Sequence, residues 1–387
     1  MDIASIGPLD VEPEQVRRAF EAVADRLEGR KLGFLYLPHD VDAGPLLKAA
    51  CDGLGDRVVG ATTGGAAFTE RGFTRDGVVG GVIGGSGFDY SVAVAHDLSP
   101  RKTQRLEDAC GELVVAARKS VSRVPALLAL GDGRSIDGVA LTETLSRSLP
   151  PHWRIFGGTA GDSLVFEDRS RVFVDGEVLD GAAVLVGLFS DSNCGVAVGH
   201  GWSAVQGAKE LAVSEIDGHN LIGLDGRPAA EVFGEELHRL GLVPDPAVLV
   251  PDASRYQFGA RSRFGELTVR AALEFPGDGS IRLAGGVTLG TVLQVVATTP
   301  ERLAESASEV GRRAVAEFPD GRTPRGGLVF DCAGRLAYLE DAYPSQLRGF
   351  FAGHAFPVVG VTSYGEIAKF GGSLEGFHNA TAVMAAW

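Results

Sequence analysis

The chain has 387 residues, 45% of them apolar and 22% charged, a mixture typical of a globular protein with more than one domain. Its 50 acidic and 36 basic residues give a net charge of −14, which disfavours binding to nucleic acid or to an anionic membrane. The sequence has no apolar run of about 20 residues and no export signal at its start. We therefore expect a cytoplasmic protein without membrane insertion.

The first part of the chain alternates predicted helices and strands. Apolar residues recur every three or four positions over 11–29, which predicts an amphipathic helix. A buried strand follows over 31–40, then a helix over 43–54 and a strand over 57–65 that runs into a glycine turn. DGVVGGVIGG and FDYSVAVAHD are two further strands. Their connection is too short for a crossover helix, so we expect an antiparallel hairpin.

The same order returns twice. The second pass has a helix over 99–121, a strand over 125–133, a helix over 137–149 and a strand over 154–163. DGAAVLVGLFS and CGVAVGHGW close it as a second expected antiparallel hairpin. A third pass has predicted elements at these positions: a helix over 299–318, strands over 326–335 and 356–366, and a last strand in HNATAVMAAW.

Three segments resemble copies of one element, namely VVGATTGG, IFGGTAGD and VVGVTSYGE. Gly60 and Gly157 are 97 residues apart, and Gly157 and Gly360 are 203 apart, about twice that period. This spacing favours duplication, with a middle copy decayed or rebuilt within 210–290. The alternative is that the three segments are alike by chance, because the chain is rich in glycine. Strand patterning stops near 205–225. We therefore predict an α/β protein of two domains, 1–210 and 211–387, built from related strand–helix units. Their mixed sheets contain antiparallel hairpins and are flanked by helices.

In each of the three segments, a buried strand ends in a turn that carries hydroxyl or acidic groups. Glycine lets backbone amides approach a ligand, and ligands of open α/β sheets bind at the carboxyl ends of strands. These turns are therefore candidate ligand-binding sites, while tight turns that satisfy their own backbone groups remain the alternative. The candidates are Thr62, Thr63 and Gly64 in the first turn, Thr159, Gly161 and Asp162 in the second, and Thr362, Tyr364 and Glu366 in the third.

Motifs of the common catalytic classes are missing from the sequence. It has no GxxxxGK[ST] phosphate loop, no HExxH zinc motif and no GxSxG elbow with a plausible triad, so we expect no enzyme activity. Asp132 and Asp137 in GDGRSIDG could hold a metal, but a helix cap explains this turn better. The four cysteines form no CxxC pair, which indicates reduced, buried thiols.

Several segments together resemble one family. FGGTAGD, VFVDGEVLDGAAVLV and GHGW are similar to the end of the FIST N-terminal domain. LDGRPAAEVF, LVFDCAGR, SYGEIAKF and FHNATAV resemble the FIST C-terminal domain. This resemblance implies a cytoplasmic signal-input module for a small ligand such as an amino acid. Because the sequence ends at Trp387, it resembles stand-alone members that act on a separate output protein, such as a histidine kinase.

The resemblance also supplies motif residues. Those carried over are Asp162, Asp225, Gly226, Cys332, Arg335, Gly365, Glu366 and Asn379. For a C-terminal site we favour Tyr364, Gly365 and Glu366 with Arg335 nearby, because a carboxylate receives an ammonium group and an arginine clamps a carboxylate. An internal ion pair between Arg335 and Glu366 is the alternative.

Haem binding and nitric oxide sensing form the second functional hypothesis, because some stand-alone relatives resemble haem-binding regulators of a histidine kinase. An enzyme with a non-obvious site and a purely structural protein rank third and fourth. If haem is bound, its ligand should lie on the wall of an apolar pocket. His200 and His378 are then the first candidates, because both lie in segments that resemble the family, and His354 follows them.

Overall fold

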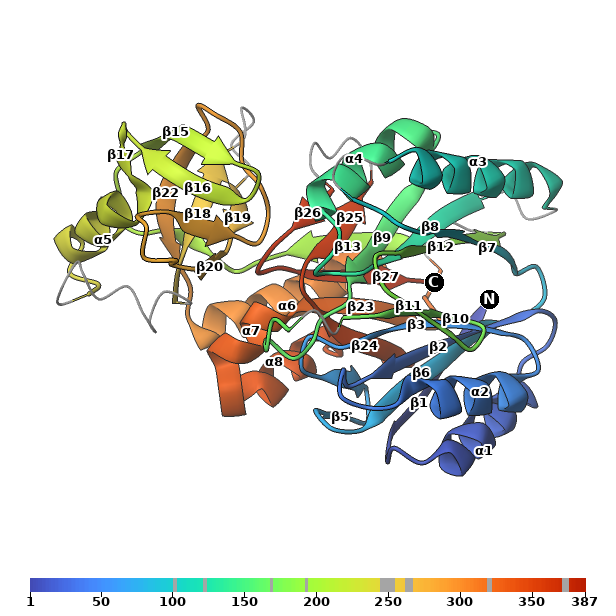
Figure 1. Ribbon diagram of the computed structural model, residues 1–387. Helices are drawn as coiled ribbons and strands as arrows, with labels where there is room; N and C mark the ends of the chain where they lie inside the picture. Colours follow the sequence, from blue (N-terminus) through green and yellow to red (C-terminus); the bar gives the residue numbers. More distant parts are fainter. Residues whose placement is uncertain are drawn as a thin grey trace.

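The structure is a computed structural model. It describes residues 1–99, 103–120, 124–167, 170–191, 194–243, 255–261, 267–318, 322–370 and 376–387. The fold is α/β with mixed sheets that contain antiparallel strands, as predicted. Figure 1 shows three helix-covered sheets packed together and, beside them, a smaller group of strands. We call residues 203–297 the small β unit and all other residues the body.

Each sheet of the body has six strands. The first, in spatial order, consists of β1 (Asp2–Leu9), β6 (Val78–Gly84), β2 (Lys31–Leu37), β3 (Arg57–Thr62), β10 (Val172–Val174) and β11 (Glu177–Leu179). The second consists of β7 (Asp89–Ala95), β12 (Ala183–Ser190), β8 (Val124–Gly131), β9 (Arg154–Thr159), β25 (Glu366–Lys369) and β26 (Phe377–His378). The third consists of β13 (Gly195–Gly199), β27 (Ala382–Ala386), β23 (Gly327–Cys332), β24 (Val358–Ser363), β4 (Ala67–Thr69) and β5 (Gly72–Thr74).

The three sheets follow one plan. In each sheet the third and fourth strands are parallel, and the second strand runs antiparallel to the third. The registers also agree, because Gly60, Gly157 and Gly360 pair with Leu35, Ala129 and Val329 across the parallel pair, each two residues before the threonine of its own repeat. The body is therefore a threefold repeat of one strand–helix unit, which confirms the repeated element seen in the sequence.

The last two strands of each sheet form a hairpin that comes from another repeat. β4–β5 follows β3 in the chain but pairs with β24, β10–β11 follows β9 but pairs with β3, and β25–β26 follows β24 but pairs with β9. Each repeat thus gives a hairpin to one neighbour and receives one from the other. This exchange closes the body into a ring of three repeats.

Two details of the predicted repeat are wrong. The third copy is intact, and residues 210–290 are not a decayed middle copy; most of the small β unit, inserted between β13 and α6 (Pro300–Ala316), occupies this range. The two predicted hairpins do not form either, because β6 and β7 lie in different sheets, as do β12 and β13. A short connection can carry the chain across to the next sheet, so its length alone does not identify the pairing partner.

Helices cover the outer face of each sheet, and most of them match the predicted ranges. α1 (Pro13–Ala24) and α2 (Ala43–Leu54) cover the first sheet, α3 (Gln104–Lys119) and α4 (Gly138–Ser148) the second, and α6 (Pro300–Ala316), α7 (Ala333–Leu339) and α8 (Tyr343–Phe350) the third. A 3₁₀ turn, η3 (Glu340–Ala342), joins α7 to α8. The inner faces of the three sheets meet in one apolar core that includes Phe34, Phe156 and Phe330. None of the helices in the described ranges is long and apolar enough to span a membrane.

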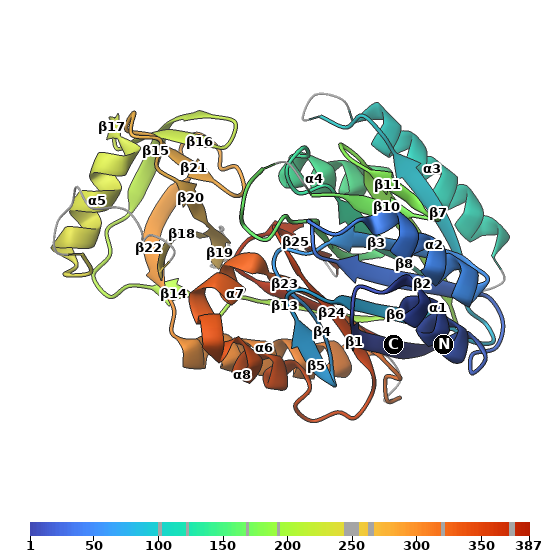
Figure 2. The ribbon, with the colours of Figure 1, turned by 60° about the horizontal axis from the view of Figure 1, so that its bottom comes forward.

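The small β unit consists mainly of antiparallel strands. They are β14 (Ser203–Ala204), β15 (Leu211–Asp217), β16 (Asn220–Leu224), β17 (Arg227–Pro228), β18 (Tyr256–Arg261), β19 (Leu267–Arg270), β20 (Ala272–Glu274), β21 (Ile281–Leu283) and β22 (Val292–Ala297). Helix α5 (Ala229–Arg239) packs on them through Phe233, whose ring centroid lies 4.4 Å from that of Phe258. The predicted domain boundary at 210/211 falls at the start of β15. Figures 1 and 2 show the unit beside the body, next to α4, α7 and the β25–β26 hairpin.

Candidate functional site

The three candidate turns meet where the three repeats join. The amide of Gly64 donates to the carbonyl of Thr362 (2.7 Å), the amide of Gly161 to that of Thr62 (3.1 Å), and the amide of Tyr364 to that of Thr159 (3.0 Å). Each donor lies two residues after the threonine of its own repeat, so the three bonds are equivalent. They close a ring, which we call the turn ring.

The threonines of the turn ring hold the exchanged hairpins. The Thr62 hydroxyl donates to the Gly161 carbonyl (2.7 Å) and accepts from the Arg171 amide (2.9 Å). The Thr362 hydroxyl bonds both the amide and the carbonyl of Ala66 at 2.9 Å. Thr62, Thr63, Thr159 and Thr362 are all buried. These hydroxyls therefore satisfy backbone groups of the fold, as the alternative interpretation of the turns expects.

Asp162 and Tyr364 form the polar edge of this ring. The Tyr364 hydroxyl donates to Asp162 Oδ1 and accepts from the Leu164 amide (2.8 Å). Asp162 also accepts from the amides of Phe166 (3.2 Å) and Glu167 (2.8 Å). Burial and the bond to Asp162 raise the pKa of Tyr364 above its ordinary value. The structure thus unites candidate residues of two different turns.

Arg335 lies apart from the turn ring in a buried polar network. Its Nε lies 3.0 Å from Asp331 Oδ1, and its Nη2 donates to Gln346 Oε1 (2.9 Å) and to the Leu303 carbonyl (3.0 Å). Burial raises the pKa of Asp331 to about 6, although Arg335, Tyr343 and Gln346 act against this rise. Arg335 is fully buried, so its guanidinium fixes α7, α6 and α8 to one another.

Glu366 has different partners from those expected. Its Oε1 accepts from the Ser363 hydroxyl (3.0 Å), and its Oε2 accepts from the Thr381 hydroxyl (2.7 Å) and amide (3.2 Å). The ion pair of Arg335 is made with Asp331, whereas Glu366 is bound by hydroxyl and amide groups. Burial raises the pKa of Glu366 to about 8, against the lowering effect of Thr381 and Ser363.

A cavity of about 130 Å³ opens beside Tyr364, between the body and the small β unit. We call it the aromatic cavity, because Phe166, Tyr364 and Phe377 form part of its wall. Its other lining residues are Gly133, Arg134, Ile136, Gly138, Thr159, Leu164, His219, Ala271, Leu273, Arg282, Leu283, Ala284, Cys332, Ala333, Gly334 and Asn379. Of the candidate ligand-binding residues, Thr159 and Tyr364 lie on this wall, and Thr62, Thr63, Gly64, Asp162, Arg335, Gly365 and Glu366 do not.

Asn379 is the most informative polar group of the aromatic cavity. The side chain is 1% exposed, and its Nδ2 donates to the His378 carbonyl (3.1 Å). Its Oδ1 is buried and accepts no hydrogen bond from any described residue. A buried acceptor without a donor costs about 1–3 kcal/mol, and most buried polar groups are paired with protein or water.

Basic and imidazole groups lie elsewhere on the same wall. Arg134 Nη2 donates to the Phe166 carbonyl (3.2 Å), and its guanidinium lies 5.3 Å from the Phe166 ring centroid. His219 Nε2, from the small β unit, lies 3.4 Å from Asp137 Oδ2 of the body. Asp137 also caps α4 by accepting from the amides of Val139 and Ala140, which confirms the predicted helix cap. Arg134 and His219 are not among the candidates that the sequence predicts.

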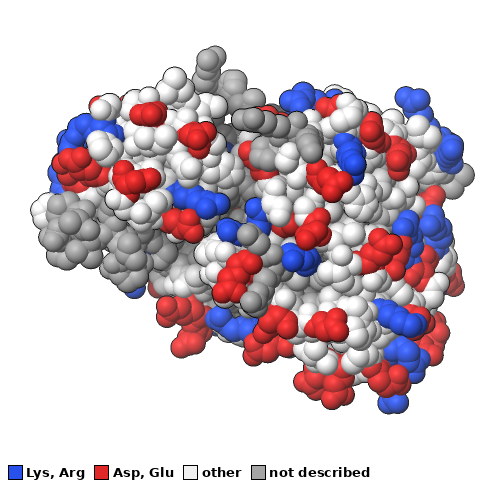
Figure 3. Space-filling view, viewed as in Figure 1, with Lys and Arg blue, Asp and Glu red and all other residues white. Residues whose placement is uncertain are grey.

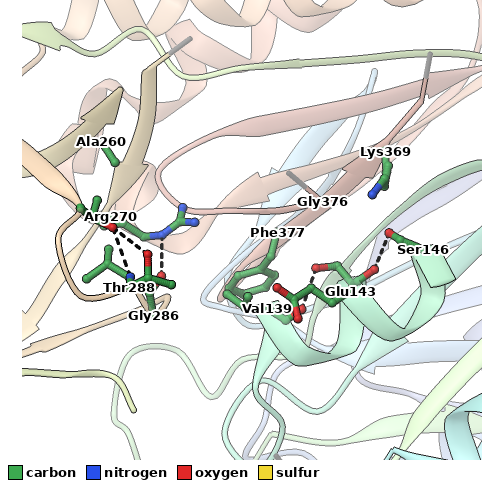
Figure 4. Close-up of a pocket in the computed structure, with 13 residues that line it drawn as sticks. Val139, Glu143, Ser146, Ala260, Arg270, Gly286, Thr288, Lys369, Gly376 and Phe377 are labelled. Atoms are coloured by element: carbon green, nitrogen blue, oxygen red, sulfur yellow. Dashed lines mark hydrogen bonds between the residues drawn. The ribbon is translucent and has the colours of Figure 1, made fainter. Parts of the chain in front are cut away.

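A second cavity, of about 210 Å³, shares Phe377 with the first. We call it the charged cavity, because Glu143, Arg270 and Lys369 line it (Figure 4). Its remaining lining residues are Val139, Thr142, Ser146, Ala260, Gly286, Val287, Thr288, Thr291, Gly376 and Phe377. Figure 3 shows basic side chains near the junction of the small β unit with the body, on a face that also carries many acidic ones.

Comparison with known families now assigns the chain. The sequence model of the FIST N domain matches residues 31–227, and that of the FIST C domain matches residues 229–369. The chain belongs to the FIST family. FIST domains are associated with sensing in signal transduction. A search of individually characterised proteins found no match.

The FIST motif residues contribute unequally to the two cavities. Cys332 and Asn379 lie on the wall of the aromatic cavity. Asp225 accepts from the Ala212 amide at the β16–β17 turn, and Gly226 has a positive φ of 79° there.

The four cysteines are free thiols, of which Cys110, Cys194 and Cys332 are buried as expected and Cys51 is half-buried.

The haem hypothesis does not fit the described geometry of this FIST chain. The Nδ1 of His200 accepts from the Trp202 amide (2.9 Å), and His378 Nε2 lies 3.2 Å from the Ala368 carbonyl. Neither histidine lines the aromatic or the charged cavity. Both cavities are also smaller than the roughly 300–1,000 Å³ of pockets that hold drug-sized ligands. Within the described ranges, no three His, Cys, Asp or Glu residues are grouped to hold a metal.

Proposed function

We propose that this FIST protein is a small-ligand sensor in signal transduction, and that the aromatic cavity is its ligand site. The observation that carries the proposal is the buried Oδ1 of Asn379, which has no donor among the described residues and belongs to a residue that lines the cavity. A ligand with an ammonium, amide or hydroxyl group would supply that donor. The proposed role is therefore binding and not catalysis.

The size and lining of the aromatic cavity favour a small ligand with an apolar part. Its volume of about 130 Å³ is close to the roughly 150 Å³ of a cavity that accepts benzene. Ile136 and Leu164 of the body and Leu283 of the small β unit offer apolar contacts. Arg134, which also lines the cavity, could bind a carboxylate. An amino acid with an apolar side chain combines these groups.

The position of the cavity gives ligand binding a route to a signal. Arg134 and Asn379 belong to the body, whereas His219, Leu273 and Leu283 belong to the small β unit. A ligand held by both parts stabilises one arrangement of them. We expect a separate output protein, such as a histidine kinase, to distinguish the two arrangements, and this partner remains a prediction.

The test measures ligand binding to an Asn379→Leu variant. Small molecules released from the purified protein are identified by mass spectrometry, and the common amino acids are screened by thermal shift and calorimetry. We expect Asn379→Leu to lower the affinity for the ligand found with the wild-type protein by at least tenfold. The melting temperature without ligand should stay the same or rise, because a buried acceptor without a partner has been removed.

Asn220→Leu is the control, because Asn220 is exposed at the start of β16 and does not line the aromatic cavity. It should bind the ligand as the wild-type protein does. Full affinity in the Asn379→Leu variant would contradict the proposed site.

A further inference from the structure

The charged cavity is a separate space with its own chemistry. Helix α4 supplies one wall, the small β unit a second, and the strands β25 and β26 a third. Phe377 forms part of the boundary with the aromatic cavity, and its ring lies close to Gly138 and Gly365, where a Cβ would come within 2.1 Å of it. Because only glycine leaves room for the ring at both positions, the Phe377 ring is held in place between the two cavities.

Opposite charges face this space from the body. Lys369 lies at the end of β25, and Glu143 lies on α4. Within the part of the chain that the structure describes, neither the Lys369 ammonium nor the Glu143 carboxylate has a hydrogen-bond or ion-pair partner, and Figure 4 draws none at Lys369. Groups that line one cavity without pairing with each other are available to a ligand.

A second cation comes from the small β unit. Arg270 is 6% exposed and is oriented by two backbone groups, because its Nε donates to the Gly286 carbonyl (3.1 Å) and its Nη1 to the Val269 carbonyl (3.1 Å). Figure 4 shows its guanidinium extending from the small β unit toward Phe377, while Lys369 extends from the body. A planar, oriented guanidinium suits a carboxylate.

Hydroxyl groups complete the wall. The hydroxyls of Thr288 and Thr291 bond each other at 3.0 Å, and the Ser146 hydroxyl donates to the Thr142 carbonyl (2.6 Å). Each of these oxygens retains lone pairs that can accept a hydrogen bond from a ligand. The cavity thus combines two cations from different parts of the molecule with one carboxylate and several hydroxyl acceptors.

We propose that the charged cavity is a second ligand site, and that it takes a small hydroxylated organic acid. The ligand's carboxylate groups bind Lys369 and Arg270, and its hydroxyl group donates to Glu143. Such a ligand connects the body to the small β unit, because Lys369 and Arg270 belong to different parts. This site is independent of the proposed function, since Asn379 does not line it.

The test titrates the full-length protein with L-malate and with succinate at constant ionic strength and neutral pH, by calorimetry. The two acids differ in one hydroxyl group. We expect malate to bind at least fivefold more tightly than succinate, because only malate can donate to Glu143. Lys369→Met should weaken both acids at least tenfold, and Glu143→Gln should remove most of the preference for malate.

Controls separate this site from general effects of charge and from the aromatic cavity. Lys48→Met removes one positive charge from the exposed face of α2 and should leave both affinities unchanged. Asn379→Leu should also leave malate binding unchanged, so a failed aromatic site and a failed charged site give different results. Glu143 is exposed, so its variant should fold even if Lys369→Met does not. The proposal is overturned if neither acid binds at concentrations up to about 10 mM. It is equally overturned if Lys48→Met weakens binding as much as Lys369→Met.

Discussion

Glu366 illustrates how a single buried carboxyl group ties protonation to stability. The group is fully buried, and its partners are the hydroxyl and amide groups of Ser363 and Thr381. Neutral partners offset the cost of burying a charge only in part, so the protonated form is favoured. Burial therefore raises the pKa of Glu366 from an ordinary 4.5 to about 8.

The first prediction concerns the pH dependence of stability. Between about pH 4.5 and pH 8 the folded protein keeps the Glu366 proton and the unfolded chain loses it. The free energy of unfolding therefore falls as pH rises through this range. Glu366→Gln cannot ionise, and the Ser363 hydroxyl can turn to accept from the new amide. We expect a shallower fall from pH 5 to pH 8 in this variant, and greater stability than the wild-type protein at pH 9, in urea titrations. Parallel pH profiles of the two proteins would contradict a raised pKa.

At the residue scale, the sequence identified chemically important positions better than it identified their partners. Tyr364, between β24 and β25, Glu366, at the start of β25, and Arg335, on α7, are all buried or half-buried polar groups. The pairing of Arg335 with Asp331 depends on how α7 leaves β23, which no local pattern contains. Asn379 was recognised only as part of a motif. Its missing donor becomes visible only when the neighbouring backbone is in place.

At the element scale, the turn ring explains why glycines recur at the strand ends. A Cβ on Gly161 would lie 2.5 Å from the Cα of Gly64 and 2.8 Å from the Tyr364 ring. A Cβ on Gly64 would lie 2.7 Å from that of Ala333. Two backbones meet here without room for a side chain. The repeated glycines therefore serve the junction of the repeats.

The second prediction compares two glycine substitutions. Gly161→Ala forces backbone atoms of the turn ring apart and should destabilise the protein by about 1–3 kcal/mol. Gly111→Ala is the matched control, because Gly111 is exposed on α3 and a Cβ there would meet nothing within 4 Å. It should stabilise the protein by about 0.5–1 kcal/mol through helix propensity. Chemical denaturation measures both. An equal effect of the two substitutions would argue against close packing in the turn ring.

Local patterns predicted the helices and long strands of the body well, because these elements carry their own periodicity. The helix over 43–54 has the predicted bounds, with the Asp42 side chain at its start and Gly55 in a left-handed conformation at its end. Strand pairing was not predictable in the same way. β6 and β7 are neighbours in sequence, yet β6 pairs with β2 in the first sheet and β7 pairs with β12 in the second, and no local pattern marks this change of sheet. In the short strands of the small β unit, the alternation of apolar and polar residues is too weak to predict a strand.

At the scale of the whole molecule, Trp202 marks the junction between the small β unit and the body. Trp202 lies at this junction, where it packs with Val269, Val296 and Ala380 and donates from Nε1 to the Ala380 carbonyl (3.2 Å). The Thr298 hydroxyl donates to the Gly201 carbonyl (2.9 Å), which joins the two chain segments that lead into and out of the unit. Since both cavities lie across this junction, its strength determines how firmly their walls are held together.

The last prediction is that Trp202 couples the small β unit to the body. Trp202→Ala removes the ring that bridges them, and loss of a buried tryptophan typically costs about 3–5 kcal/mol. We expect hydrogen exchange, followed by mass spectrometry, to become faster in β15, β16 and β22 while β2, β8 and β23 keep their protection. Trp153→Ala is the matched control, because Trp153 packs against Phe189 inside the body. It should instead raise exchange in the second sheet of the body, around β8 and β9. If Trp202→Ala raised exchange equally in all sheets, the small β unit and the body would unfold as one cooperative unit, and a ligand could not act by changing their arrangement.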